Sequence, residues 1–123
     1  TWRCPIVNKV VFYRKRGMHM KYEFIEYLQQ HKQDTLAVTT ILKTHGSTPR
    51  KAGTTMIVHP DGSIFGTIGG GRAENEIRLG AVDALKKKER FRRIYVDLND
   101  DVAIKEGMVC GGNMDVLIET YHV

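Results

Sequence analysis

The sequence predicts a fold in the α/β to α+β range, with a mixed β-sheet of about five strands and two or three flanking helices in a single domain. Three observations support this fold class. Short runs rich in β-branched residues alternate with two segments whose apolar residues recur at helical spacing. One pair of runs is separated by a Pro-Asp-Gly turn, which is typical of a hairpin. Two other connections are long enough to be crossovers, so both parallel and antiparallel neighbours are expected.

The first half of the chain predicts a helix, a buried strand and a hairpin. Residues Tyr22–Gln33 form the expected helix, and one stripe of it holds Phe24, Ile25 and Leu28, with Gln29 at its border. The run Thr35–Thr44 is almost continuously apolar and β-branched, which is typical of a buried strand. After a polar loop, the strands Thr54–His59 and Ser63–Ile68 flank the turn.

The second half predicts a helix after three adjacent glycines and then two more strands. Apolar residues recur at helical spacing up to the basic run Lys86–Lys88, at Ala73, Ile77, Ala81, Ala84 and Leu85. Lysines in a last turn suit the negative end of the helix dipole. Strands are expected around Arg92–Leu98 and over Met114–Tyr121, with a short helical turn within residues 101–108.

The net charge of +5 lies entirely in the first twenty residues. Residues 1–20 carry five basic side chains and no acidic one, whereas the rest of the chain carries 14 of each. The domain itself therefore gives no electrostatic reason to expect nucleic acid as a partner. No segment approaches the roughly 20 apolar residues that a membrane span needs.

Residues 1–20 are expected to be a leader outside the domain, which spans residues 21–123. The leader is interpreted as a disordered segment or an addition from cloning or upstream translation. The alternative is a native extension in which KVVFY, residues 9–13, forms an edge strand. The two cysteines, Cys4 and Cys110, are far apart, so no disulfide framework is expected and a cytoplasmic location is the default.

The stretch GTIGGGRAENE, residues 66–76, places Gly69–Gly71 at the expected strand-to-helix junction. Backbone N–H groups at a helix N-terminus lack partners and bind anions readily. Arg72 follows directly and would add a charge-assisted contact. The spacing matches neither the dinucleotide-binding motif nor the P-loop. These residues are equally compatible with an anion site and with a tight packing turn.

Two further loops accompany buried strands. The loop His45–Gly53 offers Ser47 and Arg50, and the sequence VCGGN places Cys110 before Gly111 and Gly112. A thiol there would serve as a nucleophile, a soft-metal ligand or a sulfur carrier, although a lone cysteine is more often a small buried hydrophobe. No histidine spacing predicts a metal site. Together, the three glycine-bearing loops predict a shared pocket for a phosphorylated ligand.

Four motifs in order resemble the N-terminal domain of the XdhC/CoxI family, the accessory proteins of xanthine dehydrogenase and related molybdenum hydroxylases. The motifs are Gly-Ser-Thr-Pro-Arg, the Asp-Gly hairpin, Gly-Thr-Ile-Gly-Gly-Gly with Glu74 after it, and Cys-Gly-Gly before the last strand. The resemblance covers Tyr22–Tyr121. It implies an accessory factor, a chaperone rather than an enzyme, that binds the molybdenum cofactor (molybdopterin), supports its sulfuration and delivers it to the apo-hydroxylase.

The resemblance also implies roles for particular residues. Gly69, Gly70 and Gly71 would hold the pterin's phosphate with Ser47, Arg50 and Arg72, and Cys110 would stand near the molybdenum beside Gly111 and Gly112. No catalytic residue and no further metal ligand are implied. The implied partners are the hydroxylase apo-subunit and a sulfur-donor protein. The resemblance leaves open whether the cofactor is a dinucleotide and whether the chain forms a homo-oligomer.

Two departures from the family pattern bear on these roles. Family members often carry a cysteine after the glycines, where this chain has Arg72, which favours anion binding and weakens the case for sulfur handling. Fuller members continue into a C-terminal dinucleotide-binding-like domain. The alternatives are a sulfurtransferase or redox enzyme that depends on Cys110, and a nucleotide-binding or docking module.

Overall fold

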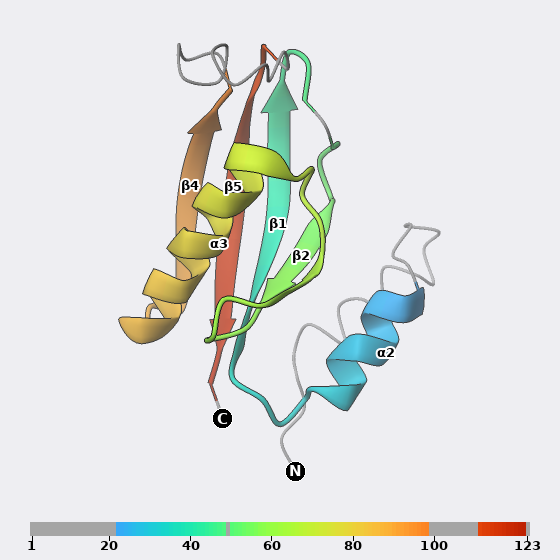
Figure 1. The fold of residues 1–123 in the computed structure, drawn as a ribbon, viewed down its shortest axis with the longest axis vertical. Helices are drawn as coiled ribbons and strands as arrows, with labels where there is room; N and C mark the ends of the chain where they lie inside the picture. The colour runs from blue at the N-terminus through green and yellow to red at the C-terminus, as the bar shows by residue number, and fades with distance from the viewer. Residues whose placement is uncertain (1–21, 49, 99–110, 123) are drawn as a thin grey trace. The chain divides into compact units, whose positions relative to one another are not determined.

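A computed structural model describes residues 22–48, 50–98 and 111–122 of the chain (Figure 1). The chain divides into two compact units, of which the larger is Thr35–Thr120 and the smaller includes residues 22–34. The expected boundary between a leader and the domain lies outside the described residues. So does the helical turn expected within residues 101–108.

The described residues of the smaller unit include helix α2, Tyr22–Gln30. The apolar residues that predicted it, Phe24, Ile25 and Leu28, are all buried, whereas Gln29 is exposed. The helix ends three residues before the predicted Gln33 because the chain turns at residues 31–34. There the amide of Asp34 donates to the carbonyl of His31 at 2.9 Å, and the His31 ring lies 2.7 Å from the Asp34 carboxylate.

The described part of the larger unit contains a five-stranded sheet, and helix α3, Gly71–Lys86, lies across a face of it (Figure 1). The strands lie in the order β3-β2-β1-β5-β4. Their bounds are Leu36–His45 for β1, Thr55–Val58 for β2, Ile64–Gly66 for β3, Phe91–Asp97 for β4 and Asn113–Tyr121 for β5. Helix α3 connects β3 to β4.

Neighbouring strands of this sheet run antiparallel. The β1–β2, β2–β3 and β4–β5 pairs are antiparallel, and Figure 1 shows β1 and β5 pointing in opposite directions. The predicted fold class, in the range from α/β to α+β, is confirmed, and the structure is an α+β fold. The sheet is antiparallel, whereas the sequence predicts a mixed sheet. The reason is that the crossover through α3 joins β3 to β4, which lie at opposite edges of the sheet, so it creates no parallel neighbours.

The core of the larger unit lies between the sheet and α3. The five apolar residues whose spacing predicted α3 are all buried: Ala73, Ile77, Ala81, Ala84 and Leu85. They pack with alternate residues of the strands, among them Met114, Val116 and Ile118 of β5. This alternation is the period of a strand with one face toward a core. The arrangement fixes the N-terminus of α3, and with it the glycines, relative to the sheet.

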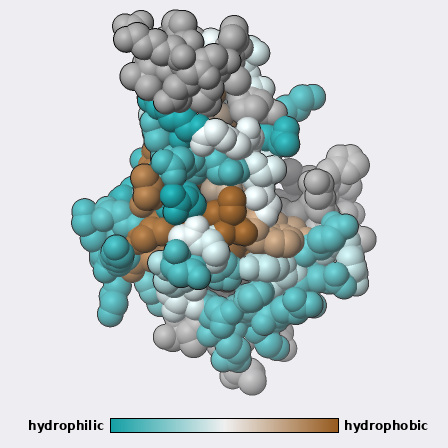
Figure 2. All heavy atoms as spheres, viewed as in Figure 1, coloured by the Kyte–Doolittle hydropathy of each residue, from teal (hydrophilic) through white to brown (hydrophobic). Residues whose placement is uncertain are grey.

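Polar side chains cover most of the surface seen from the α3 side, with small apolar areas between them (Figure 2). The helix thus turns its charged residues outward, as expected for an amphipathic helix on a sheet. Neither helix in the described part of the chain is long and apolar enough to cross a membrane.

Candidate functional site

Residues 67–71, which we call the glycine loop, connect β3 to α3. Its three glycines have positive φ angles, 130° at Gly69, 75° at Gly70 and 63° at Gly71. Residues with a Cβ rarely adopt this region, whereas glycine enters it freely. The backbone conformation therefore accounts for the run of three glycines that the sequence presents.

The end of the glycine loop at Gly70 is open. A Cβ built on Gly70 would meet no heavy atom within 4 Å. Gly70 is also the N-cap of α3, and no side chain caps the helix there. The first N–H groups of a helix lack helical partners and carry partial positive charge. The loop therefore offers an open approach to N–H donors, which suits an anionic ligand.

The carboxylate of Glu74 ties the first turn of α3 to the glycine loop. Its Oε1 accepts hydrogen bonds from the Thr67 hydroxyl at 2.5 Å and from the Ile68 amide at 3.2 Å. The Thr67 Oγ1 in turn accepts from the Gly69 amide at 3.0 Å. The side chain of Ile68 is fully buried in the core. The family resemblance points to Glu74, whereas no pattern in the sequence indicates Thr67.

Arg72 is engaged within α3. Its Nη2 lies 3.0 Å from Oε1 of Glu76, one helical turn later. The segment Gly69–Glu76 contains one basic and two acidic side chains, so its side chains carry a net charge of −1. Side-chain charge therefore gives this segment no net attraction for an anion, and an anion would depend on the backbone amides.

The loop after β1 and the loop before β5 lie backbone against backbone. A Cβ on Gly112 would stand 2.4 Å from the carbonyl oxygen of Ser47 and 2.5 Å from that of His45. A Cβ on Gly46 would stand 3.1 Å from the carbonyl oxygen of Gly111. Two of the three loops expected to share a pocket are thus in contact. The contact also gives Gly112 a packing reason to be glycine, and its role in cofactor binding stays a prediction.

Ser47 and Arg50 are both exposed on the loop after β1. The hydroxyl of Thr48 donates to the carbonyl of Arg50 at 2.8 Å, which holds the backbone of this loop. Figure 1 shows that the loop, the start of β5 and the N-terminus of α3 lie toward the same end of the sheet. Cys110 lies outside the described residues. A pocket shared by all three loops therefore stays a prediction.

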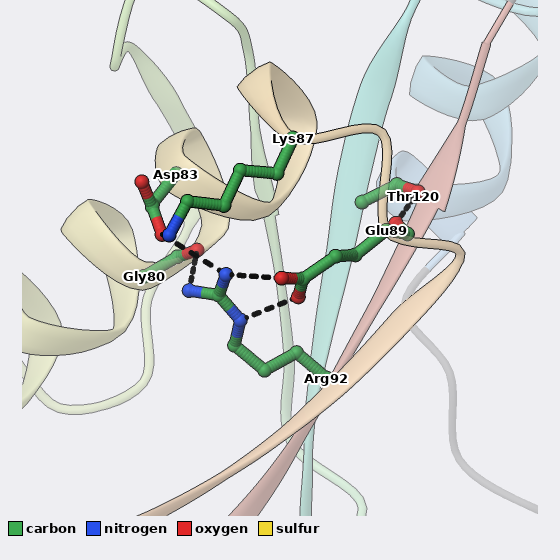
Figure 3. A network of polar contacts seen from close by, with 6 residues as sticks. All are labelled: Gly80, Asp83, Lys87, Glu89, Arg92 and Thr120. Atoms are coloured by element: carbon green, nitrogen blue, oxygen red, sulfur yellow. Dashed lines mark hydrogen bonds and ion pairs between the residues drawn. The ribbon is translucent and has the colours of Figure 1, made fainter.

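The described residues contain no group of three or more His, Cys, Asp and Glu side chains that would hold a metal ion. The most connected charged cluster instead joins the C-terminal end of α3 to β4 (Figure 3). Arg92 donates to both carboxylate oxygens of Glu89 at 2.7 and 2.8 Å, to Asp83 at 2.9 Å and to the carbonyl of Gly80 at 3.3 Å.

The hydrogen bonds of this cluster shift the pKa values of its members. The Arg92 guanidinium, with Lys87 helping at Asp83, holds the pKa of the Asp83 and Glu89 carboxyls below their usual range. Glu89 and Asp83 in turn raise the pKa of Arg92. Because the cluster lies at the opposite end of α3 from the glycine loop, we assign it to stability rather than to ligand binding.

The chain matches the sequence model of the XdhC and CoxI family over residues 29–95, a range that includes the glycine loop. It is 36% identical over 85 residues to the Escherichia coli (strain K12) protein named "Uncharacterized protein YqeB", covering 69% of this chain and 15% of that protein.

The fold is also similar to the crystal structure of a xanthine dehydrogenase from Bacillus halodurans, with a TM-score of 0.68 and 28% identity. That match covers 80% of this chain and 29% of the other. The chain therefore spans a minor part of the length of both proteins.

Proposed function

The chain belongs to the XdhC and CoxI family, and on that premise we propose that it binds the molybdenum cofactor as an accessory factor in the maturation of a xanthine dehydrogenase-type hydroxylase. Two findings support a link to this class of enzyme. One is the family itself, and the other is the similarity of the fold to the Bacillus halodurans protein. The proposed partners are the apo-subunit of the hydroxylase and a sulfur-donor protein.

The observation that carries this proposal is the uncapped, open end of the glycine loop. The phosphate of the pterin is an anion, and amide N–H groups at a helix N-terminus suit such a group. The absence of a Cβ at Gly70 leaves room for the ligand to approach these donors. The residues present therefore fit the phosphate end of the cofactor.

Residues from the neighbouring loops complete the proposed site. Ser47 would donate its hydroxyl, and Arg50 would contribute a guanidinium, which matches phosphate oxygens in geometry and charge. Both are exposed, and the loop that contains them lies toward the same end of the sheet as the N-terminus of α3 (Figure 1). Cys110 is proposed to stand near the molybdenum, because it directly precedes Gly111 in the loop that contacts residues 45–47. When bound, the cofactor supplies the molybdenum centre on which the hydroxylase depends.

The proposal is tested by anaerobic gel filtration of the purified chain with molybdenum cofactor released from a purified hydroxylase. We expect the cofactor to elute with the protein. The variant Gly70→Ala should weaken retention by about tenfold, since its Cβ occupies the approach to the amides and its backbone angles, φ 75° and ψ −174°, cost a residue with a Cβ about 1–3 kcal/mol.

Gly53→Ala is the matched control. Gly53 also has a positive φ, 93°, and a Cβ there also meets no atom within 4 Å, so Gly53→Ala likewise adds a Cβ at a positive φ without a steric clash, at another place in the chain. Equal losses of retention in both variants would contradict a ligand-facing Gly70. Cofactor that elutes alone from a folded wild-type chain would refute the proposed function.

A further inference from the structure

We infer that Glu74 is a positioning residue which, together with Thr67, selects the amides of the glycine loop that face the ligand. The inference deepens the proposed function and rests on it. Thr67 follows β3 and Glu74 lies in the first turn of α3, so their hydrogen bond closes the loop at its base. The ligand would then be bound by the far end of the loop.

The amides of the glycine loop fall into two groups. The amide of Ile68 donates a hydrogen bond to the Glu74 carboxylate, and the amide of Gly69 donates one to the Thr67 hydroxyl. The amides of Gly70 and Gly71 donate no hydrogen bond among the described residues. Within the loop, the donors left for an anion are therefore those of Gly70 and Gly71.

The hydrogen bonds at the base of the loop run in one direction. The Gly69 amide donates to the Thr67 hydroxyl, and that hydroxyl donates to Glu74. In such a chain each bond polarises the next, and a bond to a carboxylate is stronger than one between neutral groups. Glycines alone would leave the loop many conformations. Ordering it before the ligand arrives lowers the entropic cost of binding.

Whether replacement of Glu74 weakens or strengthens ligand binding distinguishes a positioning role from an effect of its charge. Glu74 places a negative charge close to the amides proposed to bind an anion, so removal of this charge alone would strengthen binding. If Glu74 acts by positioning, its removal weakens binding instead. Glu76 offers a matched control because it carries the same charge two residues later and is bound to Arg72 rather than to the loop.

The experiment compares cofactor retention in the wild type and four variants. We expect Glu74→Ala and Thr67→Val to weaken retention by about tenfold to a hundredfold, the range for a lost hydrogen bond to a charged group. Thr67→Ser keeps the hydroxyl and should stay within about threefold of the wild type. Glu76→Gln should leave retention unchanged or raise it.

Hydrogen–deuterium exchange provides a readout that does not depend on the cofactor. The amides of Ile68 and Gly69 should exchange faster in Glu74→Ala than in Glu76→Gln, because only the first variant removes their acceptor network. Circular dichroism should show both variants folded, since Ile68 and the apolar face of α3 keep their places in the core.

Two results would overturn the inference while leaving the proposed function intact. One is a folded Glu74→Ala variant that retains the cofactor as well as Glu76→Gln does. The other is unchanged exchange at Ile68 and Gly69 in Glu74→Ala. If the folded wild type fails to retain the cofactor, the proposed function is refuted together with the positioning role of Glu74 in ligand binding, and this pattern differs from the first two.

Discussion

The structural reason for a glycine differs from one position of the candidate site to another. Gly70 needs a left-handed backbone and has open space beside it, whereas Gly112 is buried with two carbonyl oxygens where a Cβ would stand. Both belong to runs of adjacent glycines, and the sequence alone does not distinguish the two positions. Only the surroundings of each residue show that Gly70 is free to face a ligand while Gly112 holds two loops together.

A stability measurement at the residue scale tests both explanations. Gly112→Ala should lower the free energy of unfolding by about 2–3 kcal/mol, because the overlapping atoms are backbone carbonyls that move only with their loop. Gly70→Ala, which meets no atom, should lose about 1–3 kcal/mol through its backbone angles alone, φ 75° and ψ −174°. Urea unfolding measures both. A Gly112→Ala variant as stable as the wild type would show that the two loops separate readily.

At the scale of elements, α3 lies close to the sheet at Gly80. A Cβ there would lie 2.4 Å from Cδ1 of Ile94 on β4 and 3.5 Å from Cδ1 of Ile118 on β5. The first distance requires Ile94 to move, and the second is an ordinary contact. The helix therefore contains a glycine for packing, at a cost in helix propensity of about 1 kcal/mol relative to alanine.

This packing predicts an interaction between two substitutions. Gly80→Ala should gain little or lose stability in the wild type, because displacement of Ile94 offsets the helix propensity. In an Ile94→Val background, which lacks Cδ1, the same change should stabilise by up to about 1 kcal/mol. Thermal or urea unfolding of the four proteins measures the difference. Equal effects of Gly80→Ala in both backgrounds would mean that Ile94 does not limit the approach of α3.

At the scale of the whole molecule, acid should destabilise the fold through the cluster around Arg92 (Figure 3). The pKa values of Asp83 and Glu89 are lowered in the folded state, so the unfolded chain binds more protons in acid. Their contribution to stability is complete above the ordinary carboxyl pKa values of about 4 and is lost as the pH falls through the lower folded values.

Arg92→Gln removes the largest cause of both shifts. We expect it to destabilise the protein at pH values of about 6–7, with the difference from the wild type shrinking as the pH falls toward about 3. Asp61, whose pKa is lowered by hydrogen bonds from Ser63 in the β2–β3 turn, should titrate alike in both proteins. Urea unfolding at several pH values measures the effect. A difference independent of pH would assign the loss to packing of the Arg92 side chain.

Much of the fold could be predicted because its signals are local. Helix α3 follows the spacing of its buried residues, and all five expected strands are present within a few residues of their predicted bounds. Strand β3 ends at Gly66 rather than at the predicted Ile68, because Thr67 and Ile68 turn away to meet Glu74. Less of the candidate site could be predicted, since its loops meet through backbone contacts between distant segments.

The sequence by itself determined the helices, the strands, the family and the unusual backbone of Gly69–Gly71, because periodicity, β-branching and glycine act over a few residues. Only the tertiary structure decided that all strands alternate in direction, that Arg72 pairs with Glu76 and that Glu74 holds the base of the glycine loop. These outcomes depend on distances between atoms in space. Spacing along the chain cannot set such distances until the packing of α3 on the sheet brings the segments together.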